Sequence, residues 1–247
     1  MSSNKTYLYG KNSILERLKA NPKSIKNVYV QENFNSPQVL HLFKAKQIPY
    51  RVVSEKELSR VKRADRLQGI IAEVSRFEYT PLENLISSNN PKRPCLLFLD
   101  DISDPHNLGS ILRITACFGG FAVVVPRHSS CEVNDTVMHV ASGGENFTPV
   151  AMVSNTLNAI IKAKDAGYWI AATVVEGGHD LSSFESPFPI AIVLGSEGKG
   201  IKQAILKHVD LNITLKMAGQ PLSLNVAMAS AIFCYEISNQ LIEKKPK

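Results

Sequence analysis

Residues 95–113 read "CLLFLDDISDPHNLGSILR", and this stretch contains the transition on which the fold depends. Its first six residues form an apolar run typical of a buried strand, and a polar turn follows at once. A helical pattern then begins near Leu108 and places Arg113 between apolar neighbours. The stretch therefore predicts a strand, a short turn and a helix in direct succession.

The same alternation of strand and helix signals continues to the end of the chain. The expected strands are Cys95–Leu99, Phe121–Val125, Val150–Val153, Tyr168–Val174, Ile190–Leu194 and Leu211–Leu215. Helices are expected near 108–118, 134–141, 156–166 and 199–208, and a last one from Asn225 to Glu243. Continuous apolar strands such as "IAIVL" favour a parallel sheet covered on both faces, so the fold class is α/β. Ligands of such sheets bind beyond the carboxyl ends of the strands, which singles out loops 100–109, 195–200 and 216–224.

The first loop offers a helix cap and a cation. Asn107 can cap the following helix, and Gly109 allows a close backbone approach. Arg113 lies about one and a half turns into the helix. A purely structural interpretation is a local ion pair between Arg113 and one of the neighbouring carboxylates, Asp100, Asp101 or Asp104.

The second loop, residues 194–201, reads "LGSEGKGI" and holds three glycines around Glu197. It matches neither a G-x-G-x-x-G nor a Walker A sequence, which argues against nucleotide phosphate binding by those routes and against a nucleotide-dependent dehydrogenase. The glycines indicate close backbone approach or unusual dihedral angles. The structural alternative is a tight loop that caps a helix starting near Lys199.

The third loop opens "KMAGQPLSLN", where Gly219 and Pro221 form the expected turn. Ser223 and Asn225 then place a hydroxyl and an amide at the start of a helix rich in small residues. The structural alternative is helix capping by Ser223, which leaves Asn225 in solvent.

Taken together, the three segments resemble the motifs of the SPOUT methyltransferases, specifically the SpoU branch of RNA ribose 2′-O-methyltransferases. The matching residues are "DPHNLGSILR", "IVLGSEGKGI" and "SLNVAMASAIFCYE", in the family's order and spacing. With "YGKNSILERL" and "QGIIAEV" in the first third, the resemblance covers nearly the whole chain. Two departures from the family pattern are Ala227, where serine is common, and Gly144, where alanine is frequent.

The resemblance implies a cofactor, a site and a topology. The cofactor is S-adenosylmethionine, no metal is needed, and the C-terminal chain threads a deep trefoil knot. The implied catalytic residues are Asn107, Arg113, Glu197, Ser223 and Asn225. The implied cofactor-binding residues are Leu194, Gly195, Leu215, Met217 and Leu224. Arg113 is either the general base or, because a guanidinium stays protonated in proteins, an electrostatic clamp.

The first third of the chain predicts a smaller α/β domain. Helix signals at 12–21, from Ser36 and after Ser54 alternate with strand signals at 24–31, 48–53 and 68–74, and Ser54 with Glu57 forms a capping box. Residues 1–76 are therefore assigned to this domain, 77–94 to a linker and 95–247 to the knotted domain. The small domain resembles certain kink-turn-binding ribosomal proteins.

The charge distribution points to a polyanionic partner. Residues 1–90 carry 15 Lys and Arg against 8 Asp and Glu, whereas the remainder carries 13 against 14. The basic first third favours structured RNA, although a solvated basic face would look the same. The resemblance is nearest to bacterial enzymes that methylate a guanosine ribose of 23S ribosomal RNA. A tRNA methyltransferase and a non-catalytic RNA-binding protein of the same fold are the alternatives.

The remaining sequence features concern location and assembly. The first residues lack an apolar signal core and no apolar run could span a bilayer, so we expect a soluble, cytoplasmic protein without membrane contact. Four scattered cysteines favour neither disulfides nor a zinc site. The resemblance implies a homodimer with the last helix in its interface.

Overall fold

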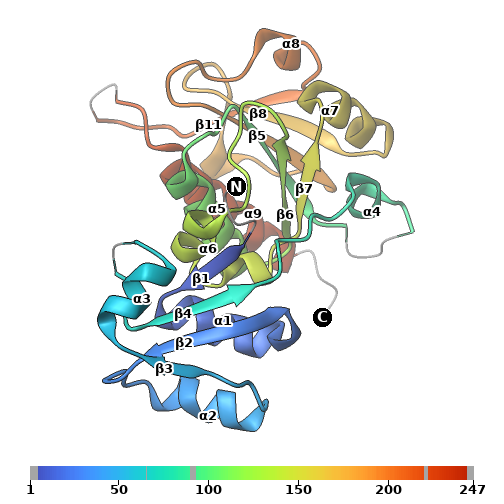
Figure 1. The fold of residues 1–247 in the computed structure, drawn as a ribbon. Coiled ribbons are helices and arrows are strands. Elements are labelled where there is room, and N and C mark those ends of the chain that lie inside the picture. The colour runs from blue at the N-terminus through green and yellow to red at the C-terminus, as the bar shows by residue number, and fades with distance from the viewer. Residues whose placement is uncertain (1–4, 65, 90–92, 220–221, 244–247) are drawn as a thin grey trace.

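The computed structural model describes residues 5–64, 66–89, 93–219 and 222–243. These residues form a four-stranded sheet in the first third and a seven-stranded sheet in the remainder, each with its own helices (Figure 1). The predicted α/β class and the predicted parallel sheet are confirmed. No helix among the described residues is both long and apolar enough to cross a membrane.

The smaller sheet has the order β1-β4-β2-β3. Its strands are β1 (Thr6–Tyr9), β2 (Ile25–Gln31), β3 (Arg51–Val53) and β4 (Ile70–Val74), and its helices are α1 (Lys11–Ala20), α2 (Pro37–Ala45) and α3 (Glu55–Val61). The capping box at the start of α3 is confirmed, because Ser54 and Glu57 exchange side-chain and backbone hydrogen bonds. Strand β1 was not predicted, since its four residues are too few to show a periodic pattern.

The larger sheet has the order β7-β6-β5-β10-β8-β11-β9, and every neighbouring pair runs parallel. Its strands are β5 (Cys95–Asp100), β6 (Phe121–Pro126), β7 (Val150–Val153), β8 (Trp169–Thr173), β9 (His179–Asp180), β10 (Ile190–Gly195) and β11 (Leu211–Thr214). The six predicted strands are all present. The two-residue strand β9 was not predicted, because nothing in its sequence has strand character.

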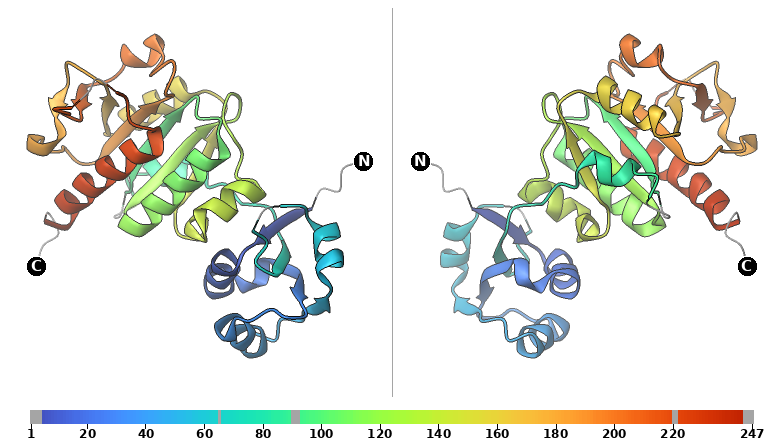
Figure 2. Two further views of the ribbon diagram at one scale, coloured as in Figure 1. Left: turned by 90° about the vertical axis from the view of Figure 1, so that its left-hand side faces the viewer. Right: turned by 90° about the vertical axis from the view of Figure 1, so that its right-hand side faces the viewer.

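Helices cover both faces of this sheet, as the continuous apolar strands required. One face packs on α5 (Pro105–Phe118) and α9 (Val226–Glu243), and the other on α4 (Leu82–Ile86), α7 (Thr156–Asp165) and α8 (Gln203–Leu206) (Figure 2). The helix predicted over 199–208 is wrong in extent. Ser196 and Gly200 form a tight bridge, and the chain becomes helical only at α8.

The segment predicted as a linker is packed against the larger sheet. Helix α4 lies within it and buries Leu82, Leu85 and Ile86 against strand and helix residues. The backbone N–H of Thr80 also donates to the carbonyl of Val150 at 2.8 Å. Residues 90–92 of this segment lie outside the described residues.

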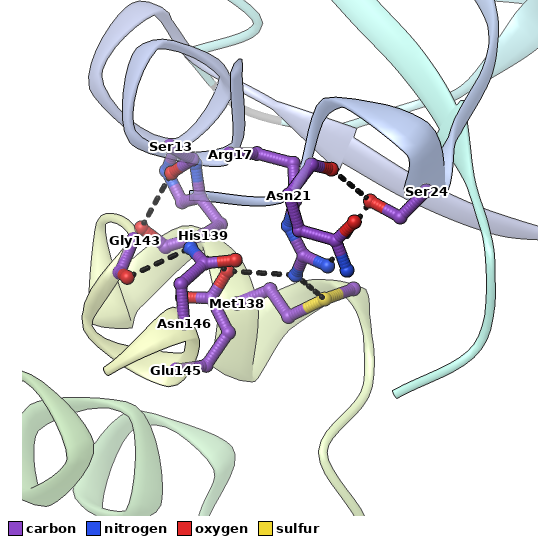
Figure 3. A network of polar contacts seen from close by, with 9 residues as sticks. All are labelled: Ser13, Arg17, Asn21, Ser24, Met138, His139, Gly143, Glu145 and Asn146. Atoms are coloured by element: carbon purple, nitrogen blue, oxygen red, sulfur yellow. Dashed lines mark hydrogen bonds and ion pairs between the residues drawn. The ribbon is translucent and has the colours of Figure 1, made fainter. Parts of the chain in front are cut away.

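The two sheets meet at helix α6 (Asp135–Ala141) and the 3₁₀ turn Gly144–Asn146 that follows it. Figure 3 shows Arg17 of α1 reaching across this junction, where its guanidinium donates to Glu145 Oε1 at 3.0 Å. The two side chains are only 7% and 0% exposed. Leu18 of α1 and Met138 of α6 belong to one cluster of buried apolar side chains, which is therefore continuous across the junction. The N-terminal unit is thus packed against the C-terminal one.

Candidate functional site

The three predicted loops converge where β5, β10 and β11 end. The side chain of Asp100, at the end of β5, is fully buried and accepts from both the backbone N–H and the Nζ of Lys202, at 3.0 and 2.9 Å. Asp101 accepts from the same ammonium at 3.1 Å. Lys202 therefore joins the first loop to the second, a contact the sequence analysis missed. Its only sequence signal was a carboxylate at the end of an apolar strand.

These ion pairs also shift the acidity of the groups involved. Hydrogen bonds from Ser129 and Lys202 hold the pKa of Asp101 below its usual value. The hydrogen bond to Asp100 raises the pKa of Lys202. Both groups are thus held in their charged forms, and the pairing fixes the geometry of the two loops.

Helix α5 begins at a residue other than the predicted cap. Asp104 is the N-cap, since its Oδ1 accepts from the backbone N–H of His106 at 2.9 Å, and Pro105 occupies the first helical position. Asn107 as the cap is therefore wrong. Because the cap is provided by Asp104, the amide of Asn107 is available for contacts outside the helix.

Asn107, Glu197 and Asn225 form one hydrogen-bonded cluster drawn from all three loops. Asn225 Nδ2 donates to Glu197 Oε1 at 2.7 Å and to Asn107 Oδ1 at 2.9 Å. Asn107 Nδ2 and the backbone N–H of Val226 donate to the same Glu197 oxygen, at 3.4 and 3.3 Å. One exposed carboxylate thus collects several donors and keeps contact with solvent.

The start of α9 is organised by Asn225 and not by Ser223. Asn225 Oδ1 accepts from the backbone N–H of Ala227 at 2.8 Å, which is the geometry of a helix cap. Helix capping by Ser223 with a solvated Asn225 is therefore wrong. Ser223 is exposed and lies beside the cavity described next. Pro221, half of the predicted turn, lies outside the described residues.

A largely apolar cavity of about 260 Å³ adjoins this cluster. Its walls come from the ends of β8 and β10, the third loop and the first turns of α9. They include the five residues predicted to bind a cofactor, Leu194, Gly195, Leu215, Met217 and Leu224, together with Glu197, Ser223 and Phe233. The polar cluster therefore stands at the edge of an apolar recess.

Gly195 is required where the second loop folds back. A Cβ atom at this position would collide with the backbone of Gly200 and Ile201. The backbone N–H of Gly200 donates to the carbonyl of Ser196 at 2.8 Å and closes the turn. A side chain at 195 would push the loop outward and displace Glu197 from the cluster.

Arg113 lies apart from this cavity. Its side chain is exposed on α5, does not line the cavity, and forms no hydrogen bond or ion pair with any described residue. The predicted alternative of a local ion pair is therefore wrong, because Asp100 and Asp101 are engaged by Lys202. The backbone at Arg113 is in tight contact with Gly144, where an added Cβ would lie 2.8 Å from the Arg113 Cα.

Across the described ranges, no group of three or more His, Cys, Asp or Glu side chains is placed to hold a metal ion. The four cysteines are unpaired. Burial raises the pKa of Cys95 and of Cys234 to about 12, so both are protonated side chains of the core.

The sequence matches two families that together span most of the chain. Residues 94–235 match the SpoU rRNA Methylase family, and residues 7–80 match the family described as "RNA 2'-O ribose methyltransferase substrate binding". The chain belongs to the SpoU rRNA methylase family.

Similar proteins include enzymes with named substrates. The chain is 31% identical to the 23S rRNA (guanosine-2'-O-)-methyltransferase RlmB of Neisseria meningitidis, over 99% of both chains. It is 33% identical to the enzyme of the same name from Pseudomonas aeruginosa, over 94% of this chain and 96% of that one. The SpoU methyltransferase AviRb of Streptomyces viridochromogenes, solved with AdoMet, has the same fold at a TM-score of 0.80 and 19% identity, over 98% and 92% of the chains.

Proposed function

We propose that the protein transfers a methyl group from S-adenosylmethionine to the 2′-hydroxyl of a ribose in RNA. The observation that carries this proposal is the junction of an apolar cavity with the cluster of Asn107, Glu197 and Asn225 at its edge. Membership of the SpoU rRNA methylase family supports the same reaction.

The cavity suits the adenosine part of the cofactor. Leu194, Leu215 and Leu224 offer apolar walls for a flat aromatic base, and Gly195 brings backbone close to the recess. Met217 lies on the open side, where it is 43% exposed. These residues would hold the cofactor with its methyl group facing the polar cluster.

When bound, S-adenosylmethionine supplies the methyl group on a positively charged sulfur, which becomes a neutral thioether as the methyl leaves. The ribose oxygen gains the methyl group and gives its proton to solvent water, which reaches the exposed edge of the cavity at Glu197 and Ser223. Negative charge therefore develops on that oxygen during transfer. Glu197, Ser223 and Asn225 would orient the target ribose at the edge of the cavity, with Asn107 fixing the Glu197 carboxylate.

Arg113 supplies positive charge to this chemistry. A guanidinium stays protonated in a protein, so it is a poor acceptor for the ribose proton. Because its side chain pairs with no carboxylate among the described residues, its positive charge is available to the substrate. We assign Arg113 to the clamping of the target phosphate and to stabilisation of the developing alkoxide.

The proposal is tested by incubating the protein with labelled S-adenosylmethionine and with separate ribosomal and transfer RNA pools. Labelled RNA with 2′-O-methyl positions mapped onto it is the expected result. Binding of RNA without any label would show a non-catalytic RNA-binding protein.

A guanosine of 23S ribosomal RNA is the proposed target. Relatives at 31% and 33% identity over nearly the whole chain carry that activity in their names. Label confined to the transfer RNA pool would favour the alternative, a tRNA ribose methyltransferase. The small basic domain, residues 1–76, is assigned to RNA binding, with 77–94 as the connection and 95–247 as the catalytic domain.

We also propose a homodimer, because α9 exposes an apolar face. Met228 is 63% exposed and Tyr235 is 55% exposed, and Ile232 and Ile242 follow at helical spacing. A second copy of this chain would cover these side chains. Sedimentation of a dimer is expected, and a monomer at working concentration would contradict it.

Two finer features of the fold belong to the same proposal. The third loop carries the chain from β11 past the second loop to α9, in the part of the sheet where family members thread a trefoil knot. Pulling both ends in an optical trap should leave the unfolded chain shorter than about 3.5 Å per residue, and the full length would show an unknotted chain. The four-stranded sheet with α1–α3 supports a ribosomal-protein-like domain, and a cytoplasmic location fits an RNA substrate.

A further inference from the structure

A cleft of about 760 Å³ separates the loop after α3 from the pair of helices α5 and α6. One wall carries Lys62, Arg63 and Arg66 of the N-terminal unit, and the other carries His106 of α5 with Thr136 and His139 of α6. Helices α5 and α6 lie between the two sheets, so this cleft joins the basic unit to the catalytic unit (Figure 1).

The cleft concentrates positive charge that no carboxylate among the described residues neutralises completely. Lys62 is paired with Asp135 at 2.6 Å, so its charge is offset. Arg63 and Arg66 are exposed and form no hydrogen bond or ion pair with any described residue. No carboxylate among the described residues lines the cleft. Two exposed guanidinium groups without a partner in the described part of the chain are a suitable pair of contacts for phosphates.

The far wall of the cleft leads toward Arg113. His106 and Arg113 are seven residues apart, so they share one face of α5 and are separated by about 10 Å along its axis. Both side chains are exposed. His106 is also the chain neighbour of Asn107, which belongs to the polar cluster. An RNA strand lying in the cleft would therefore pass His106 and continue along this face of α5 to Arg113.

Two other large clefts fit an RNA backbone less well. The cleft of about 680 Å³ around Phe34 shares Arg66 with the first cleft, but it lies within the N-terminal unit, includes Glu55 and reaches no residue of the catalytic unit. The cleft of about 590 Å³ around Phe147 includes Glu78 and Glu145 and none of the residues of the polar cluster. The cleft beside Arg63 and Arg66 combines free cations with access to α5.

We propose that this cleft holds an unpaired stretch of the substrate RNA, whose phosphates contact Arg63 and Arg66 and whose target nucleotide then reaches Arg113. The proposal rests on the proposed function, since it names the path of the same substrate. The N-terminal unit, which packs on α6, thus guides the RNA strand toward Arg113.

The test compares two variants that each remove two positive charges from the N-terminal unit. The first is Arg63→Ala with Arg66→Asn, because Arg66 has φ 61° and asparagine tolerates that conformation. The control is Lys44→Ala with Lys46→Ala, since both lysines are exposed on or next to α2 and line none of these clefts. The probe is a transcript of the RNA that the wild-type protein labels.

Binding is measured by fluorescence anisotropy across a range of salt concentrations. The Arg63 and Arg66 variant should bind the transcript at least about tenfold more weakly, and its slope of log K against log salt should fall by about 1.4, the value for two single-strand phosphates. The control should keep the wild-type slope. Both variants should bind S-adenosylmethionine like the wild type in calorimetry.

Crosslinking of a 4-thiouridine transcript locates the strand independently. Adducts at Lys62, Arg63 and His106 are expected, since these three line only the proposed cleft, whereas adducts at 31–35 or at 145–149 would overturn the proposal. Equal RNA binding by the two variants would overturn it as well, with the proposed function left standing. A wild-type protein that labels no RNA would overturn the proposed function and this path together.

Discussion

Glu197 and Glu145 are two carboxylates held in opposite ways. Glu197 is exposed at the edge of the cavity, and its Oε1 accepts from two asparagine amides and one backbone N–H. Glu145 is buried at the junction of the two units, where it faces the guanidinium of Arg17. An exposed carboxylate with neutral donors can rearrange around a substrate, whereas a buried ion pair fixes two elements together.

The buried pair of Arg17 and Glu145 also leaves some of its hydrogen-bonding atoms without a partner. Arg17 Nε and Glu145 Oε2 have no hydrogen-bond partner in the structure. Burial raises the pKa of Glu145, although the guanidinium of Arg17 opposes this shift. The junction therefore depends on Arg17 to keep Glu145 charged. We expect substitutions at the junction to lower mainly the stability of the fold, and substitutions around Glu197 to lower mainly the rate of methyl transfer.

The largest expected effect follows from Arg17→Met. Removing the cation leaves a buried carboxylate without its partner, which should lower the free energy of unfolding by about 3–5 kcal/mol at pH 7. Urea denaturation followed by circular dichroism measures this loss. The paired variant Arg17→Met with Glu145→Gln should recover most of it, because no buried charge remains. Equal losses in the single and paired variants would contradict a stabilising role of the charge pairing.

Glu197→Gln should lower the rate of methyl transfer and leave the stability of the fold nearly unchanged. Because the side chain is exposed, the free energy of unfolding should change by less than about 1 kcal/mol. Methyl transfer should fall by about 100-fold or more, since the charge that orders the two asparagines is lost. Single-turnover assays at saturating cofactor measure this, and a variant with wild-type turnover would remove Glu197 from the site.

Gly144→Ala tests the contact between the junction and the helix of Arg113. The added Cβ would lie 2.8 Å from the Arg113 Cα and from the Leu112 carbonyl oxygen, so α5 must move. We expect a loss of about 1–3 kcal/mol in the free energy of unfolding and a lower turnover at unchanged cofactor affinity. Gly198→Ala is the stability control, because no atom lies within 4 Å of its added Cβ. Equal stability of both variants would contradict the close packing.

The smallest effect is the dependence of stability on pH. The pKa of Glu145 is raised in the folded state, so its contribution is present below its unfolded pKa near 4.5 and is lost as the pH rises through the folded value. The pKa of Asp101 is lowered, so its contribution is present above its unfolded value near 3.8 and is lost as the pH falls through the folded value.

Urea midpoints at about pH 2.5, pH 4.5 and pH 7.5 check both signs. Relative to the wild type, Glu145→Gln should gain stability as the pH rises from 4.5 to 7.5. The destabilisation caused by Asp101→Asn should shrink as the pH falls from 4.5 to about 2.5, because the wild-type contribution of Asp101 disappears there. Each unit of pKa shift corresponds to about 1.4 kcal/mol. A Glu145→Gln variant with the wild-type pH dependence would show that this carboxyl is not perturbed by its burial.

The sequence was sufficient to predict the larger sheet, because most of its six longer strands are largely apolar runs such as "CLLFL". The polar residues of the site could be named from three motifs, and the structure shows Asn107, Glu197 and Asn225 in contact. Pairings across long separations were not predictable in this way. The Lys202–Asp100 and Arg17–Glu145 pairs join residues 102 and 128 positions apart, and no local pattern records them.

Local capping chemistry was also misjudged where two candidates stood close together. Asp104 and Asn107 can both cap a helix, and Pro105 decided in favour of Asp104 because proline suits the first helical position. Within segment 77–94, which is polar overall, Leu82, Leu85 and Ile86 are enough to bury one turn of helix. Short helices and strands are difficult to predict from sequence because they hold too few residues to show a helical or strand periodicity.

The central claim is that Arg113 acts on the RNA and not on the fold or the cofactor. Its direct test is Arg113→Ala, with methyl transfer to RNA and calorimetric binding of S-adenosylmethionine measured on the same preparation, and Arg51→Ala on the exposed edge strand β3 as the control. We predict that transfer is abolished while cofactor affinity stays within about threefold of the wild type, since Arg113 lies outside the cavity. An equal loss of transfer and of cofactor binding would contradict the account and assign Arg113 to the structure of the site.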